Sequence, residues 1–183
     1  MNFIWMDLET TGLDPERDRI LEIAVVVTTE DLQPRFEYNK VVYFTEDWVL
    51  QARERADPVV RDMHTQNGLW AELPRSTTPL VDVAHDLVEL VRPYCWKGPP
   101  MLAGFSVHFD RSFLRYNLPD VERLLHYRNF DVSVLKTASE AWGGKLPPRK
   151  TVDVHRALPD VLESIEVARF YRPYFDLSFT RHT

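Results

Sequence analysis

The sequence has few of the features that mark secreted or membrane proteins. Cys95 is the single cysteine among 183 residues, so no internal disulfide can form, which favours a reducing compartment. No apolar stretch approaches the roughly 18 residues that a membrane-spanning helix needs. The N-terminus shows neither a basic segment nor an Arg- and Ser-rich leader. We therefore expect a cytoplasmic protein without a membrane partner, with a mitochondrial location as the alternative if a leader was removed.

Basic residues are also in short supply. The 22 Lys and Arg are outnumbered by 28 Asp and Glu, which gives a net charge of −6. Proteins that grip long nucleic acids usually carry a basic face, because neutralisation of phosphates dominates their affinity. The composition shows no excess of basic residues from which such a face could form. Either the substrate is not a nucleic acid, or it is short and held mainly through metal ions and a few contacts.

The apolar pattern predicts a three-layer α/β fold with a mixed central sheet. Strands are expected near residues 3–9, 20–27, 36–44, 101–104 and 130–132, the first three as an antiparallel meander. Helices are expected over 47–55, 59–64, 79–92, 109–116, a segment ending at 142, and 156–171. Thr78 is expected to cap the third of these, with Pro79 as its first residue. Cys95 is expected to pack as an apolar residue.

Asp7 and Glu9 close the first predicted strand. Alternate side chains of a strand point to the same face, so the two carboxylates should project together. Like charges on one face repel, and a divalent cation between them would remove the repulsion. Such hard oxygen ligands suit Mg²⁺ or Mn²⁺, and no Cys or paired His stands nearby to favour zinc. A solvated strand end is the plainer alternative for an isolated D-x-E.

Two further carboxylates and a histidine occupy helix starts. Asp110 falls in the first turn of the helix after strand 101–104, a strand-to-helix junction at the mouth of the sheet. Pro159 is tolerated only in a first turn, so the last helix should begin near residue 156. His155 then precedes that helix and Asp160 faces inward from its first turn. The alternatives are ordinary acids at helix N-termini and a surface histidine.

Taken together, these positions resemble the DEDDh 3′→5′ exonucleases, and among them the oligoribonucleases. The resemblance rests on DLETTGLDPERDRILEIAVVVT at 7–28, HTQNGL at 64–69, FDRSFL at 109–114, HYRNFDVSVLK at 126–136 and VHRALPDVLESI at 154–165, in the same order and at similar spacing. It implies an RNase H-like exonuclease domain over residues 1–173, followed by a short tail over 174–183. It also implies two divalent cations, Mg²⁺ or Mn²⁺, held by Asp7, Glu9, Asp110 and Asp160, with His155 as the general base.

The resemblance further implies a substrate. Oligoribonucleases degrade RNA of a few nucleotides, dinucleotides in particular, to 5′-mononucleotides, so an acidic net charge is acceptable. Leu13 matches a leucine that wedges against the bases, and His64 a position that touches the nucleotide. Ser106, Arg128 and Ser133 match positions around the terminal phosphate, with the arginine supplied by the partner subunit of a homodimer.

Three positions depart from the family pattern. Phe105 stands where Asn is common, Val134 replaces a hydroxyl residue, and Val59 occupies the place of a Trp or Tyr that stacks on a base. These changes leave the metal ligands intact but put a strict dinucleotide preference in doubt. The alternatives are a general DEDDh exonuclease on DNA or longer RNA, and a catalytically silent module that binds RNA or protein. The presence of all four acids and the histidine speaks against the silent module.

Overall fold

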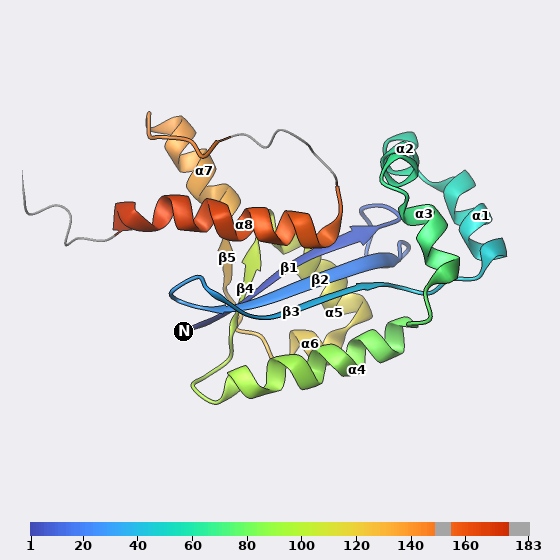
Figure 1. Cartoon of the computed structure of the whole chain (residues 1–183), viewed down its shortest axis with the longest axis horizontal. Coiled ribbons are helices and arrows are strands. Elements are labelled where there is room, and N and C mark those ends of the chain that lie inside the picture. Colours follow the sequence, from blue (N-terminus) through green and yellow to red (C-terminus); the bar gives the residue numbers. More distant parts are fainter. Residues whose placement is uncertain (149–154, 176–183) are drawn as a thin grey trace, which may run out of the picture.

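The computed structural model describes residues 1–148 and 155–175, so residues 176–183 of the predicted tail lie outside the described residues. Its centre is a five-stranded mixed sheet in the order β3-β2-β1-β4-β5 (Figure 1). The strands are β1 (Asn2–Thr10), β2 (Ile20–Thr29), β3 (Pro34–Val41), β4 (Met101–Gly104) and β5 (Asn129–Asp131). β1, β2 and β3 pair antiparallel, while β4 runs parallel to β1 and β5 parallel to β4. The predicted meander and mixed sheet are confirmed.

Helices cover both faces of this sheet. The α-helices are α1 (Glu46–Arg55), α2 (Pro58–Gln66), α3 (Leu69–Glu72), α4 (Leu80–Val91), α5 (His108–Asn117), α6 (Pro119–Glu122), α7 (Val132–Ala141) and α8 (Ala157–Tyr171). Short 3₁₀ helices span Leu73–Arg75, Arg92–Cys95 and Arg172–Phe175. Figure 1 shows α4, α5 and α6 on one face, α7 and α8 on the other, and α1, α2 and α3 beyond one end. The predicted three-layer α/β architecture is confirmed. None of the described helices is long and apolar enough to cross a membrane.

The alternation of β1 decides which face receives the acids. Its even-numbered residues 4–8 pack in the core beneath α4 and α5, whereas Phe3 and Trp5 pack with α8. Asp7 and Glu9 continue the odd-numbered set, so they lie on the same face as α8. The period of the strand thus directs both carboxylates toward the helix that carries Asp160.

A glycine lets β4 approach β1 next to the first acid. A Cβ on Gly104 would lie 2.8 Å from the carbonyl oxygen of Met6, the residue before Asp7. Only glycine fits that gap without displacing the backbone of β1. The chain then turns from β4 into α5, which brings Asp110 to the end of β1.

Some predicted boundaries were wrong. The third strand was expected to reach residue 44, but β3 ends at Val41. The N–H groups of Tyr43 and Phe44 instead donate to the carbonyls of Thr78 and Leu73, so these residues leave the sheet. The last predicted strand, 130–132, lies one residue earlier as β5, because the next residue already begins α7.

The cap predicted for α4 was also wrong. Pro79 is the N-cap, no side chain caps the helix, and the first helical residue is Leu80. A residue before proline is driven to extended backbone, and the carbonyl of Thr78 is occupied by the bond from Tyr43. Cys95 packs against the core under α4 as expected, and burial raises the pKa of its thiol.

Candidate active site

Three carboxylates from distant parts of the chain meet at the end of β1. One oxygen each of Asp7, Glu9 and Asp160 lies within 4.8 Å of the others. Asp7 and Glu9 come from β1, and Asp160 comes from the first turn of α8. An acid in a first turn is stabilised by the helix dipole, which favours this start for α8. The packing of α8 across β1 completes the cluster.

Asp110 lies beside this cluster without belonging to the same group of mutually close oxygens. It is in the first turn of α5, only 3% exposed, and its Oδ1 accepts a hydrogen bond of 2.9 Å from the N–H of Leu8. Leu8 stands between the two acids of β1, so the Asp110 carboxylate is fastened to the strand segment that carries them. Its charge is close enough to raise the pKa of Asp7.

The electrostatics of the cluster favour a bound cation. Burial, reinforced by the charges of Asp110, Glu9 and Asp160, raises the pKa of Asp7 well above its usual range. Burial followed by the charge of Glu22 raises the pKa of Glu9 to about 8. Burial also raises the pKa of Asp110 to about 8, against the opposing hydrogen bond from Leu8. Converging hard oxygen donors whose negative charges are not balanced locally fit a divalent metal ion.

His155 lies at the rim, where the chain enters α8. Its side chain is exposed and its φ of +44° is in the left-handed region, which is costly for a residue with a Cβ. Its carbonyl accepts a hydrogen bond of 2.5 Å from the side-chain amide of Asn67, in the turn between α2 and α3. This contact holds the strained backbone that presents the imidazole.

An arginine next to the histidine anchors the start of α8. The Arg156 guanidinium donates to both carboxylate oxygens of Glu22, at 2.8 and 3.0 Å, and to both of Glu72, at 2.9 and 2.8 Å. The N–H of Ala157 also reaches Glu22, at 3.3 Å. In the antiparallel register of β1 and β2, Glu22 is the residue directly opposite Glu9. Sequence reasoning missed this cluster, although Glu22 was the only charge in the apolar run 20–27 and could have signalled a buried ion pair.

Replacing Arg156 with Gln should therefore disturb the fold and the site together. Glu22 is 1% exposed and would keep a buried, poorly compensated charge, which typically costs about 3 kcal/mol or more. Turnover should fall as well, because the variant loosens the segment carrying His155 and Asp160. Thermal unfolding and steady-state kinetics measure the two effects. Glu72→Gln is the matched control, since it leaves Glu22 paired, and equal losses in both variants would contradict this account.

Ser106 and Ser133 are brought together by Asp131. The Asp131 Oδ1 accepts from the N–H of Ser106 at 3.0 Å, and from the N–H and Oγ of Ser133 at 3.0 and 2.6 Å. Asp131 is the N-cap of α7, and its charge contributes to the raised pKa of Asp110, so the serines border the carboxylates. Asp131 was not predicted. An acid two residues before a serine at a helix start was the available signal.

Two other residues that were predicted to contact the substrate, Leu13 and Arg128, lie at the surface. Leu13 is 81% exposed in the β1–β2 loop, and Arg128 is exposed just before β5. The strand ends with Asp131, so Arg128 stands at the far end of β5 from the serines of its own chain.

His64 was predicted at a position that touches the nucleotide, and the structure places its side chain in the interior. The ring is fully buried, its Nε2 donates to the carbonyl of Thr10 at 2.9 Å, and its Nδ1 lies 3.9 Å from the Glu9 carboxylate. Burial lowers its pKa, which favours the neutral ring, and the bond to Thr10 supports the end of β1 from behind. In this position it offers no surface to a nucleotide.

The fold and the carboxylate cluster define a nuclease of the exonuclease class, and the profile of a family described as "Exonuclease" matches residues 4–168. Within this class the chain belongs to the oligoribonuclease family. It is 38% identical over 175 residues to the oligoribonuclease of Paracidovorax citrulli, covering 95% of this chain and 89% of that protein. The oligoribonuclease of Hahella chejuensis is 37% identical, covering 95% and 94%. The predicted family and its enzyme class, a 3′→5′ exoribonuclease, are confirmed.

Solved structures of exonuclease I share the fold. The zinc-bound E. coli exonuclease I complex with single-stranded DNA superimposes with a TM-score of 0.72 at 17% identity, covering 98% of this chain and 42% of that chain. Exonuclease I from Methylocaldum szegediense gives a TM-score of 0.66 at 20% identity, covering 95% and 41%. The chain thus spans less than half the length of these exonuclease I chains.

Proposed function

We propose that the protein is a metal-dependent 3′→5′ exoribonuclease that degrades short oligoribonucleotides, dinucleotides in particular, to 5′-mononucleotides. The convergence of Asp7, Glu9 and Asp160, with Asp110 alongside, is the observation that carries the proposal. These four carboxylates would hold two divalent cations, Mg²⁺ or Mn²⁺. Such a pair of ions lowers the pKa of a bound water and stabilises the charge on a departing 3′ oxygen.

His155 is assigned as the general base. An exposed imidazole at the rim can accept the proton of the attacking water and pass it to solvent. Its backbone is held by Asn67, and the next residue, Arg156, is held by Glu22 and Glu72. The imidazole is thereby presented from a fixed backbone although its side chain is open to solvent.

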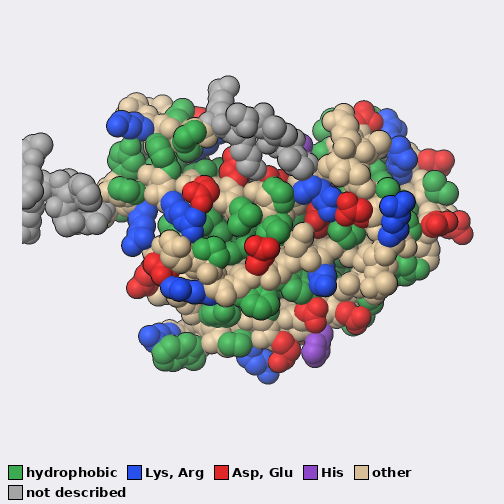
Figure 2. Space-filling view, viewed as in Figure 1, with side chains coloured by type: hydrophobic (Ala, Val, Ile, Leu, Met, Phe, Trp, Pro, Cys, Tyr) green, Lys and Arg blue, Asp and Glu red, His purple; other side chains and the backbone are tan. Residues whose placement is uncertain are grey.

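The substrate assignment follows the chemistry on either side of the carboxylates. Ser106 and Ser133, joined through Asp131, are assigned to the terminal phosphate, and the exposed Leu13 to the bases. His64, whose ring is buried against the end of β1, is assigned to the support of that strand end rather than to a direct nucleotide contact. On the face seen in Figure 2, the basic side chains of the described residues are scattered among acidic ones, as a short substrate allows.

The family departures bear on substrate length. Val59 is 75% exposed and Val134 61% exposed. Neither side chain carries the aromatic or hydroxyl group that the family pattern has at its position. Phe105 is half-buried and packs with the core under α8. Base–aromatic stacking contributes about 1–3 kcal/mol, so binding at Val59 should be weaker than in a stacking site.

Arg128 supports a homodimer. It lies at the opposite end of β5 from Asp131, so a guanidinium contacting the phosphate would come from a second subunit. We assign residues 1–173 to one exonuclease domain with a short tail over 174–183, acting in the cytoplasm as a homodimer.

Replacing Arg128 with Ala should harm the shortest substrates most. The loss of a charge-assisted hydrogen bond to the terminal phosphate should lower kcat/KM for a dinucleotide by about tenfold. Longer RNA has other contacts and should lose less. Arg123→Ala removes an exposed arginine paired with Asp120 and serves as the control. A uniform loss across lengths would contradict the phosphate assignment.

Titration of Mn²⁺ against a labelled dinucleotide and a 20-mer tests the function as a whole. We expect cleavage that depends on the cation and favours the dinucleotide. Preference for the 20-mer would indicate a general exonuclease, and cleavage of neither would indicate a silent module.

A further inference from the structure

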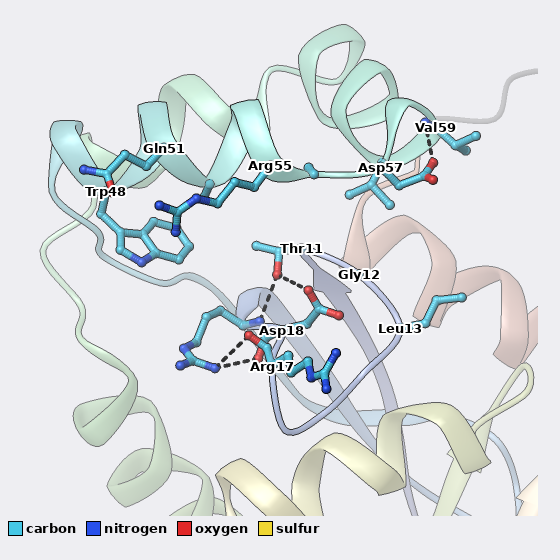
Figure 3. A pocket seen from close by; sticks show the side chains of 14 residues that line it. Thr11, Gly12, Leu13, Arg17, Asp18, Trp48, Gln51, Arg55, Asp57 and Val59 are labelled. Carbon is cyan, nitrogen blue, oxygen red and sulfur yellow. Dashed lines mark hydrogen bonds between the residues drawn. The ribbon is translucent and has the colours of Figure 1, made fainter.

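Leu13 lies in an exposed bend of the β1–β2 loop, at residues 12–13, shortly after Glu9. Its side chain is 81% exposed, and Figure 3 shows it pointing away from the loop that carries it. A side chain on a freely moving loop would have to be ordered each time a base packed against it, and that loss of conformational entropy opposes binding. A base contact at Leu13 therefore requires that contacts within the loop already fix the bend.

A single carboxylate bridges the two sides of this bend. Asp18 Oδ1 accepts a hydrogen bond of 2.8 Å from the hydroxyl of Thr11, and Oδ2 accepts one of 2.9 Å from the N–H of Asp14. Thr11 and Asp14 directly flank the two residues of the bend, so one side chain holds both ends of that pair. Figure 3 shows the Asp18 carboxylate inside the curve of the loop, bonded to Thr11.

Glycine at position 12 makes room for this Asp18 bridge. A Cβ on Gly12 would lie 2.5 Å from Oδ2 of Asp18, too close for both to keep their positions. The carbonyl of Gly12 also accepts a hydrogen bond of 2.7 Å from the hydroxyl of Thr10, the residue after Glu9. The bend is thereby connected to the strand end that carries a carboxylate of the site.

Backbone bonds complete the loop around the Asp18 bridge. The N–H of Thr11 donates to the carbonyl of Arg19 at 3.0 Å, and the N–H of Arg19 donates to the Thr11 hydroxyl at 3.0 Å. The N–H of Asp18 donates to the carbonyl of Asp14 at 2.7 Å. These bonds fix the backbone from which the Asp18 side chain reaches the bend, so the carboxylate has a defined direction.

We propose that Asp18 is a positioning residue, which fixes Leu13 in place for its contact with the bases of a short RNA. In this role Asp18 acts through residues 11–14 and does not itself touch the substrate or a cation. The inference rests on the proposed function and deepens it, because it assigns the order of the base contact to one carboxylate. The role depends on the hydrogen bonds rather than on the charge. An asparagine side chain can replace them, since its oxygen accepts from the N–H of Asp14 and its amide group donates to the Thr11 hydroxyl.

Kinetics of Asp18 variants test the Asp18 bridge. Asp18→Ala is expected to raise the KM of a dinucleotide about tenfold, the effect of roughly one residue left to be ordered on binding. Its kcat should stay at the wild-type value, because only binding is weakened, and Asp18→Asn should restore the wild-type KM. Glu16→Ala, which removes an exposed acid from the same loop, is the control for the change in charge. A fall in kcat without a change in KM would overturn the proposal.

A double-mutant cycle with Leu13→Ala tests whether Asp18 acts through that residue. If Asp18 positions Leu13, adding Asp18→Ala to Leu13→Ala should raise KM no further, because no side chain remains to be positioned. A purely structural role would affect both backgrounds equally, and the two increases in KM would then multiply. Multiplied effects would therefore also overturn the proposal.

Hydrogen exchange at the amide of Asp14 tests the Asp18 bridge without any substrate. The wild type and Asp18→Asn should protect this amide, and Asp18→Ala should lose that protection, since the acceptor is gone. Equal exchange in the wild type and Asp18→Ala overturns the proposal. If the wild type cleaves no RNA, the proposed function fails by itself, and a loss of protection in Asp18→Ala still supports the bridge that positions Leu13.

Discussion

Asp110→Asn and His155→Ala will each abolish most dinucleotide turnover. His155→Ala removes the proposed general base, whose usual contribution is about 10²-fold or more. Asp110→Asn removes the charge of a proposed metal ligand, on which the reaction depends. Only Asp110→Asn will also weaken metal binding. Asp110 is buried against the strand that carries Asp7, so its charge acts directly on the proposed ligands. His155 stands on the exposed rim before α8 and is proposed to handle a proton without holding the cation.

The Asn variant isolates charge from structure. Its side-chain carbonyl can still accept the hydrogen bond from the N–H of Leu8, so the start of α5 should remain in place. Calorimetric titration with Mn²⁺ measures metal affinity, and steady-state kinetics measure turnover. Asp120→Asn changes an exposed acid on α6 and should behave as wild type. Equal Mn²⁺ affinity in Asp110→Asn and His155→Ala would contradict the division of roles.

Much of the site could be predicted from rules that concern neighbouring residues. Alternation along β1 was enough to place Asp7 and Glu9 on one face, and the structure shows them on the face of α8. Pro159 fixed the start of the last helix to within a residue or two, because its missing N–H restricts it to a first turn. These features depend on neighbours in the chain, so the sequence contains them directly.

Features that depend on residues far apart in the chain could not be predicted from the sequence. Arg156 bonds to Glu22 across 134 positions and to Glu72 across 84, and no local pattern links them. The burial of His64 follows from how α2 closes over the end of β1, which periodicity does not report. β3 ends early for the same reason, since the N–H groups of residues 43 and 44 donate to the carbonyls of Thr78 and Leu73, outside the sheet.

Without divalent cations, the protein will lose stability as pH rises from about 4 to about 8. The folded-state pKa values of Glu9 and Asp110 are raised to about 8, whereas the unfolded chain ionises near pH 4. Below pH 4 both states hold these protons. Between the two values the unfolded state releases them and the folded state keeps them, so the free energy of unfolding falls with pH, and above 8 the loss is complete.

Mn²⁺ or Mg²⁺ will reverse that loss, because the cation binds the assembled carboxylates of the folded state. At about 100 times its Kd, a ligand specific to the folded state adds about 2.7 kcal/mol. The measurement is chemical unfolding at pH 5 and pH 8, in chelator and in Mn²⁺. The cation effect should be larger at pH 8, where fewer protons compete for the same oxygens. Asp110→Asn should show a shallower pH dependence in chelator, which separates the cluster from other titrating groups. If wild type in chelator were equally stable at both pH values, the crowded acids would not be the source of strain, and the argument for a cation between them would lose its energetic basis.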